Sequence, residues 1–318
     1  PLVVCDDSGM ARKQLIRALP PEWQVSITQA GNGEEALAAI RQGLGQIMLL
    51  DLTMPVLDGY QTLAALRSEG LSCKVVVVSG DVQEEAVRRV NELGALGFLK
   101  KPADPQLLRD MLIELGLFQL PAPSATPAAL PVRPDLTLKV NFRDALREVT
   151  NVAMGRAAAL LAKVLKVFVQ LPLPQVNIFE VSELHMTLLD AQRGERFSAV
   201  CQGFIGDGIA GEALLLFHDA EVSAMANLLE WQPKDDNETA EMLLDLASIL
   251  IGACLSGISE QIDVRFSQGH PLLLGLHASI DGLIKVNQRR WRKTLAVEIS
   301  YTLEGHDLHF DLLLLFTE

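Results

Sequence analysis

Three aspartates, one serine and one lysine in the first 101 residues have side chains that together suit phosphoryl transfer. All lie at or just beyond the end of a short apolar run: Asp6, Asp7, Asp51, Ser79 and Lys101. Carboxylate oxygens are the ligands that Mg²⁺ prefers, and this ion would shield an acceptor carboxylate from an incoming phosphoryl group. The lysine is a compact positive charge and the serine a hydroxyl donor for phosphoryl oxygens. The set therefore suits phosphorylation of a carboxylate, provided that the fold gathers it.

The alternation of strands and helices along the sequence predicts that the fold brings these five side chains together. Apolar runs typical of strands cover residues 2–5, 24–28, 46–50, 74–79 and 97–99. Helical periodicity covers residues 11–19, 33–42, 58–68, 82–93 and 105–115. This alternation predicts an α/β domain with a doubly wound, five-stranded parallel sheet. Such folds bind ligands at the carboxyl ends of the strands, where all five residues fall.

Four segments of this domain resemble the signature segments of the response-regulator receiver (CheY-like) family. They are Val3–Ser8, which contains the aspartate pair, then Asp51–Gly59, Val78-Ser79-Gly80 and Lys100-Lys101-Pro102. Their order and spacing match those of the family, and the resemblance covers residues 1–118.

The resemblance implies a phosphorylation site and a metal site. Asp51 would accept the phosphoryl group, from a histidine kinase or another phosphodonor. Mg²⁺ would be held by Asp6, Asp7, Asp51 and the backbone carbonyl of Thr53.

The same resemblance implies phosphoryl-binding and switch residues. Ser79, in place of the commoner threonine, and Lys101 would bind the phosphoryl oxygens. Phe98 lies where the family has a switch aromatic that turns inward on phosphorylation. As a core aromatic Phe98 would need no switching role, and the sequence leaves both interpretations open.

Residues 119–135 predict a linker. Five prolines in seventeen positions are incompatible with a helix or a central strand, so this segment is expected to be extended. It separates the first domain from a second domain that would cover residues 136–318.

The second domain begins with a polar pattern at helical spacing. Asp144, Glu148 and Asn151 are spaced i, i+4, i+7 and would share one helical face. Taken alone, such a stripe is more often a solvated surface than a site.

A near-repetition 97 residues later gives the pattern more weight. The residues Leu146, Glu148, Asn151 and Gly155 correspond to Leu243, Asp245, Ser248 and Gly252. Similar strands follow each copy, at residues 211–217 and 309–316. An internal duplication predicts an α+β domain with two related halves around one antiparallel sheet.

The pattern Asp-x3-Glu-x2-Asn resembles the CheC/CheX/FliY phosphatases of bacterial chemotaxis, which act on the receiver protein CheY. The resemblance implies that Asn151 positions a water for hydrolysis of phosphoaspartate, and that Glu148 pairs with the substrate receiver's lysine. In the second copy Asp245 is shorter and Ser248 lacks an amide, so that site is interpreted as degenerate.

Composition limits the other possibilities. A net charge of −13 argues against nucleic acid as a partner, and no uninterrupted apolar run reaches the ~20 residues of a membrane span. Four scattered cysteines fit buried thiols in the cytoplasm. The histidines His270, His277, His306 and His309 lack metal-ligand spacing and are interpreted as satisfied or exposed side chains.

The sequence thus predicts a receiver that regulates a CheC-like phosphatase, whose substrate is a separate CheY-like receiver. Phosphorylation would act through the surface near Phe98, with a homodimer as one arrangement that could transmit it. The rival interpretation is a non-catalytic output module that binds a partner when Asp51 is phosphorylated.

Overall fold

The computed structural model describes residues 1–119, 141–180, 196–278 and 293–317. The chain divides into two compact units, residues 1–148 and 149–318, each of which is described by itself. The predicted linker lies outside the described residues except for its first position. The predicted domain limits at 118 and 136 therefore stay a prediction.

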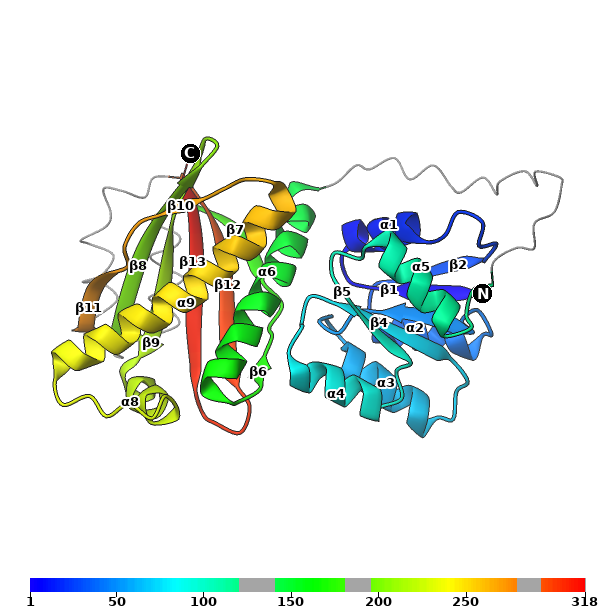
Figure 1. Ribbon diagram of the computed structural model, residues 1–318, viewed down its shortest axis with the longest axis horizontal. Helices are drawn as coiled ribbons and strands as arrows, with labels where there is room; N and C mark the ends of the chain where they lie inside the picture. The colour runs from blue at the N-terminus through cyan, green and yellow to red at the C-terminus, as the bar shows by residue number, and fades with distance from the viewer. Residues whose placement is uncertain (120–140, 181–195, 279–292, 318) are drawn as a thin grey trace. The chain divides into compact units, whose positions relative to one another are not determined.

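The first unit alternates strands and helices as the sequence predicts (Figure 1). Its strands are β1 (Leu2–Cys5), β2 (Ile27–Ala30), β3 (Ile47–Leu50), β4 (Lys74–Ser79) and β5 (Gly97–Lys100). Its helices are α1 (Gly9–Ala18), α2 (Gly33–Arg41), α3 (Gly59–Ser68), α4 (Glu84–Glu92) and α5 (Pro105–Glu114). The sheet order is β2-β1-β3-β4-β5 with every pair parallel, which confirms the predicted doubly wound fold.

Helices cover both faces of this sheet. Leu15 of α1 and Leu108 of α5 pack with Val4 and Val76 on one face. Helices α2, α3 and α4 pack on the other, where the core includes Met48 and Val77. Strands buried on both faces explain why the apolar runs in the sequence are continuous rather than alternating.

Strand β2 is displaced from its predicted position, 24–28. It covers Ile27–Ala30 because pairing with β1 begins at the Leu2–Ile27 pair. Trp23 and Val25 pack on the core beside Leu2 while lying before the ladder. Their apolar character therefore marks burial rather than strand pairing.

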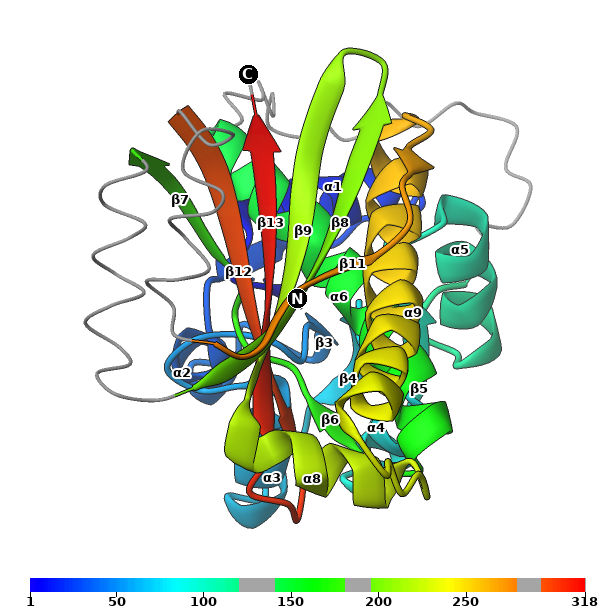
Figure 2. The ribbon, with the colours of Figure 1, turned by 90° about the vertical axis from the view of Figure 1, so that its left-hand side faces the viewer.

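The described residues of the second unit form an antiparallel sheet and the helices α6, α8 and α9 (Figure 2). The strands are β6 (Val169–Gln170), β7 (Gln175–Glu180), β8 (Phe197–Gly206), β9 (Ile209–His218), β10 (Ser267–Gln268), β11 (Leu272–Ala278), β12 (Lys293–Leu303) and β13 (His309–Thr317). The helices are α6 (Phe142–Leu165), whose first turns belong to the first unit, α8 (Asp219–Leu228) and α9 (Asp236–Ile262). The sheet order is β10-β8-β9-β13-β12-β6, with β11 on β8 and β7 on β12. The α+β class with one antiparallel sheet is as predicted.

The elements repeat with the spacing seen in the sequence. Helix α6 ends at Leu165 and α9 at Ile262, a separation of 97 residues. Strand β7 begins at Gln175 and β11 at Leu272, with the same separation. Each of these strands pairs with the hairpin of the other half, since β7 pairs with β12 and β11 with β8. The two halves are thus interlocked around the central β9–β13 pair, which supports the predicted duplication.

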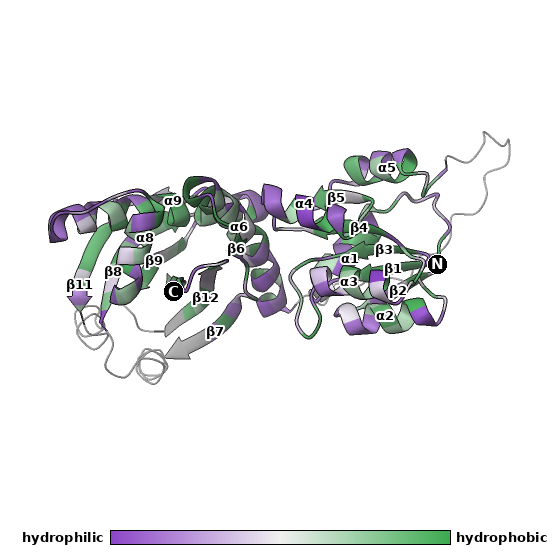
Figure 3. Ribbon diagram, turned by 90° about the horizontal axis from the view of Figure 1, so that it is seen from below, coloured by the Kyte–Doolittle hydropathy of each residue, from purple (hydrophilic) through white to green (hydrophobic). Residues whose placement is uncertain are grey.

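Helices α6 and α9 lie on one side of the strands (Figure 3). Hydrophobic residues line the strands of both sheets in the same view. Within the described residues, one helix, Asp236–Ile262, has the length and hydropathy of a membrane span, and 56% of that apolar window is buried in the unit. Leu250 and Cys254 of this helix are fully buried, as expected for a helix that packs on its own sheet.

Alanine substitutions at the two glycines of α9 are expected to change the free energy of unfolding in opposite directions. A Cβ at Gly257 would lie 2.8 Å from Cα of Ala153 on α6, so the two helices would have to move apart. A Cβ at Gly252 would meet only the side-chain oxygen of Gln268, at 3.7 Å. We expect Gly257→Ala to lower the free energy of unfolding by about 1–2 kcal/mol.

Gly252→Ala is the matched control, and it should raise the free energy of unfolding by up to about 1 kcal/mol through helix propensity. Urea denaturation of the full chain, followed by circular dichroism, measures both changes. Equal effects of the two substitutions would contradict the close approach of α6 and α9 at Gly257.

Candidate functional site

The three predicted aspartates converge at one edge of the first sheet. Asp6 follows β1 and Asp51 follows β3, two strands that pair directly. A carboxylate oxygen from each of Asp6, Asp7 and Asp51 lies within 4.8 Å of the others. The pairing of parallel strands thus brings together Asp6 and Asp51, which are 45 positions apart in the chain.

Backbone hydrogen bonds beyond the strand ends hold these residues in place. The N–H of Asp51 donates to the carbonyl of Cys5 at 2.9 Å, and the N–H of Asp6 donates to that of Ala30 at 3.1 Å. Beyond the β4–β5 pair, at the same end of the sheet, the N–H of Lys101 donates to the carbonyl of Ser79 at 2.9 Å. Backbone hydrogen bonding between neighbouring strands therefore continues at least one residue beyond the strand ends, and it fixes the positions of Asp6, Asp51 and Lys101.

Lys101 completes the cluster electrostatically. Its Nζ lies 2.7 Å from Oδ2 of Asp6 and 3.2 Å from Oδ2 of Asp51. Burial lowers the pKa of Lys101, but the charges of Asp51 and Asp6 outweigh burial and raise that pKa well above its ordinary value. Burial raises the pKa of both aspartates, and the lysine opposes this. Lys101 is therefore charged throughout the physiological range.

The donor set fits a hard divalent cation. Three aspartates carry three negative charges when ionised, and Lys101 offsets one of them. Oxygen ligands with excess negative charge are what Mg²⁺ requires. Thr53 lies in the loop between β3 and α3, two residues after Asp51, where its carbonyl was predicted to contribute. The residues present therefore fit the Mg²⁺ that the receiver resemblance implies.

Ser79 and Phe98 occupy neighbouring strands. Ser79, the last residue of β4, is fully buried, and its Oγ accepts a hydrogen bond from the N–H of Asp81 at 3.2 Å. Phe98 on β5 is half-buried and packs against the core on the α2–α4 face. Its packing suits a core residue, and its switching role stays a prediction.

Two residues that sequence reasoning missed support the cluster. Arg12 on α1 donates from Nη1 to the carbonyl of Asp6 at 2.6 Å, which fixes the backbone of the aspartate pair. Asp81 is buried just after β4 and accepts hydrogen bonds from the backbone N–H and the side chain of Gln83, both at 3.1 Å. Arg12 is not a ligand type, and Asp81, although an aspartate two residues beyond the predicted strand 74–79, lies just outside the signature segment Val78-Ser79-Gly80.

Asp81 makes stability depend on pH. Burial raises its pKa from the ordinary 3.8 to about 6, against the hydrogen bonds from Gln83. The unfolded chain releases this proton near pH 3.8 and the folded chain near pH 6, so the buried charge destabilises the fold above that range by about 3 kcal/mol. We expect Asp81→Asn to raise the free energy of unfolding by about that amount at pH 7.5.

The gain from Asp81→Asn should shrink as pH falls from about 6 and vanish below the ordinary pKa of 3.8, where the carboxyl of Asp81 is protonated in both the folded and the unfolded chain. Urea titrations at pH 7.5, 6 and 4.5 measure it. A gain that stays constant across the three values would contradict a raised pKa at Asp81.

The predicted phosphatase residues lie on α6. Glu148 and Asn151 are both within this helix, three residues apart and hence neighbours on its surface. Their counterparts in the repeat, Asp245 and Ser248, lie on α9 and are exposed. The helical spacing inferred for both copies is confirmed, and the two pairs are on different helices.

A family model for the response regulator receiver domain matches residues 2–113. A protein-glutamate methylesterase/protein-glutamine glutaminase of Halalkalibacterium halodurans is 36% identical over 121 residues, which cover 36% of this chain and 35% of that protein. The transcriptional regulatory protein NarL of Mycobacterium tuberculosis is 37% identical over 101 residues, covering 31% of this chain and 47% of NarL. The match thus spans about a third to a half of these relatives' length.

Three solved structures are similar to part of the chain. The receiver domain of NarL from Mycobacterium tuberculosis has a TM-score of 0.34 at 31% identity, covering 37% of this chain and 96% of that one. FliY of Thermotoga maritima has a TM-score of 0.40 at 16% identity, covering 55% and 91%. The chemotaxis protein CheX of Vibrio vulnificus has a TM-score of 0.38 at 13% identity, covering 54% and 99%.

Proposed function

We propose that phosphorylation of Asp51, which lies in the segment matched by the family model for the response regulator receiver domain, regulates a phosphatase in the second domain. That domain would hydrolyse the phosphoaspartate of a separate CheY-like receiver. The protein would act in the cytoplasm, in two-component or chemotaxis signalling, with a histidine kinase or another phosphodonor as its input.

The geometry around Asp51 supports the phosphorylation step. A carboxylate oxygen of Asp51 would attack the phosphorus of the donor, and the bond from phosphorus to the donor's leaving group would break. Lys101, 3.2 Å from this carboxylate, is placed to neutralise the phosphoryl oxygens, and Ser79 offers a hydroxyl donor one strand away. Bound Mg²⁺ would shield the negative charges that otherwise repel one another.

The observation that carries the phosphatase proposal is the Glu148/Asn151 pair on one face of α6. An aspartyl phosphate is an activated species, so a catalyst need only orient a water in line with phosphorus. The amide of Asn151 has both a donor and an acceptor with which to hold that water. Water would add to phosphorus, the bond to the aspartyl oxygen would break, and inorganic phosphate and free aspartate would result.

The repeat supports a single active site. Ser248 has no amide and Asp245 is one methylene shorter than glutamate, although both are exposed on α9 and accessible to a partner. The Asp144-x3-Glu148-x2-Asn151 pattern remains complete only on α6. We therefore assign hydrolysis to Asn151 and engagement of the substrate receiver's lysine to Glu148.

The substrate is assigned to a separate receiver for a kinetic reason. A phosphatase tethered to its own receiver would act on it at an effective concentration of about millimolar, so the signal on Asp51 would be erased as it formed. The direct test mixes the full chain with a phosphorylated CheY-like receiver and follows phosphate release, with and without a phosphate mimic at Asp51.

Release faster than spontaneous hydrolysis, and sensitive to the mimic, is the expected result. Binding without acceleration would favour the non-catalytic output module. Equal rates with and without the mimic, together with concentration-independent loss of the chain's own phosphate, would show self-dephosphorylation instead.

A further inference from the structure

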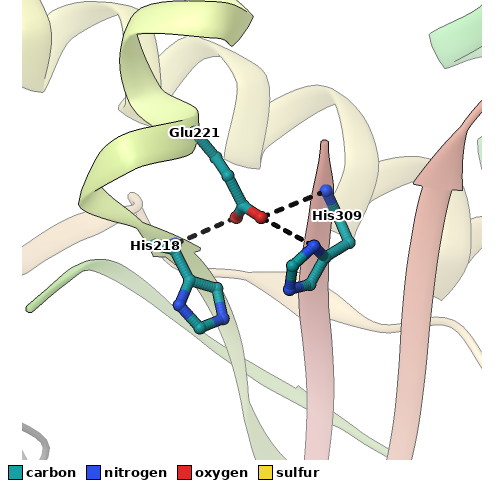
Figure 4. Close-up of side chains that lie close together, drawn as sticks. All are labelled: His218, Glu221 and His309. Carbon is teal, nitrogen blue, oxygen red and sulfur yellow. Dashed lines mark hydrogen bonds and ion pairs between the residues drawn. The ribbon is translucent and has the colours of Figure 1, made fainter. Parts of the chain in front are cut away.

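Two histidines and a glutamate meet at one end of the second sheet (Figure 4). His218 is the last residue of β9, Glu221 lies in the first turn of α8, and His309 is the first residue of β13. One ligand atom from each, an imidazole nitrogen or a carboxylate oxygen, lies within 4.8 Å of the others. Among the described residues only one other group of His, Cys, Asp and Glu meets this criterion, the aspartate cluster of the first unit.

The strand register brings the histidines together. Phe217 of β9 pairs with Phe310 of β13, so the adjoining residues, His218 and His309, come side by side at the end of the antiparallel ladder. Their ring centroids are 4.9 Å apart. Phe197 on β8 lies on the other side of His218, with its ring centroid 4.4 Å away, and limits where that imidazole can go.

Glu221 is held between the two strands. Its Oε2 accepts a hydrogen bond from the backbone N–H of His218 at 3.3 Å, and its Oε1 accepts one from the N–H of His309 at 3.4 Å. The same Oε1 lies 2.7 Å from Nδ1 of His309. The carboxylate is thus fixed by the backbone and directed toward an imidazole nitrogen.

Burial differs across the three residues in a way that suits a cation site. Glu221 is 6% exposed, whereas half of the His309 side chain is exposed. A buried carboxylate needs a compensating cation, and the exposed imidazole leaves a path from solvent. Two imidazoles and one carboxylate form a ligand set that Zn²⁺ uses, with a remaining position for water.

We propose that His218, Glu221 and His309 bind a divalent transition-metal ion such as Zn²⁺. The ion would replace the direct contact between His309 and Glu221, because Zn²⁺ bonds imidazole nitrogen and carboxylate oxygen at about 2.0–2.2 Å. It would link the start of α8 to the start of β13. This site is independent of Asp51 and of the Glu148/Asn151 pair.

Isothermal titration of the full chain with Zn²⁺ tests the proposal, with millimolar Mg²⁺ present to occupy the aspartate cluster. The expected result is saturable binding that Glu221→Gln and His309→Gln each weaken at least about tenfold, which corresponds to 1.4 kcal/mol. Glu221→Gln keeps one side-chain oxygen, which can accept one of the two backbone hydrogen bonds. His306→Gln, in the exposed turn between β12 and β13, is the control and should leave the affinity unchanged.

Thermal melting gives a second readout. A ligand that binds only the folded chain raises its melting temperature, so Zn²⁺ should raise that of the wild type and of His306→Gln, and raise that of the two site variants less. Melting without Zn²⁺ shows whether each variant is folded. No saturable binding by the wild type, or the same loss in His306→Gln as in His309→Gln, would overturn the proposal and leave a helix-capping ion pair.

Discussion

Asp51→Asn should abolish incorporation of phosphate into the full chain from a small phosphodonor such as acetyl phosphate. In the proposed function Asp51, which lies in the cluster with Asp6, Asp7 and Lys101, would supply the attacking oxygen. An asparagine amide has almost the same shape but no negative charge and no comparable nucleophilicity. Intact-mass spectrometry should therefore show one added phosphate in the wild type and none in the variant.

Asp58→Asn is the matched control for this experiment. Asp58 caps α3 through a hydrogen bond from the N–H of Gln61 at 2.8 Å, and asparagine is an equally good cap. This control should be labelled like the wild type. Chelation of Mg²⁺ should slow labelling of both, because the carboxylates around Asp51 would then be unshielded. Undiminished labelling of Asp51→Asn would show that another residue is the phosphoacceptor.

The convergence of the aspartates and Lys101 could be predicted because it follows from local signals. Asp6, Asp51, Ser79 and Lys101 each stand at a strand end, and parallel strands direct those ends to one edge of the sheet. No knowledge of side-chain packing is needed for that inference. The position of β2 was less accurate because Trp23 and Val25 are apolar for packing reasons and not for pairing.

Residues whose role depends on register could not be predicted in this way. His218 and Glu221 are 91 and 88 residues from His309, and only the pairing of Phe217 with Phe310 brings them together. His309 was accordingly interpreted as a satisfied or exposed histidine, and its half-exposed side chain, in contact with Glu221, fits that interpretation. The duplication, by contrast, was visible as a constant separation of 97 residues, which the element boundaries repeat.

Asn151→Ala should remove most of the acceleration of phosphoaspartate hydrolysis, with a fall in the maximal rate of about a hundredfold. The amide of Asn151 would hold the attacking water in line, and alanine has no polar atom to do so. Alanine is also a strong helix former, so α6 should keep its structure. Single-turnover release of phosphate from a phosphorylated receiver, at saturating full chain, isolates this step from binding.

Two further substitutions distinguish the role of Glu148 from that of Asn151 and test the second copy. Glu148→Ala should mainly raise the receiver concentration needed for half-maximal rate, because its carboxylate is assigned to binding rather than to the attacking water. Ser248→Ala changes the corresponding position of the repeat, exposed on α9, and should alter the rate less than about twofold, since serine has no amide to lose. A loss in Ser248→Ala as large as that in Asn151→Ala would mean that both halves of the duplicated domain are catalytic. Hydrolysis would then have to proceed with a hydroxyl in place of the amide, and the single-site assignment on α6 would be wrong.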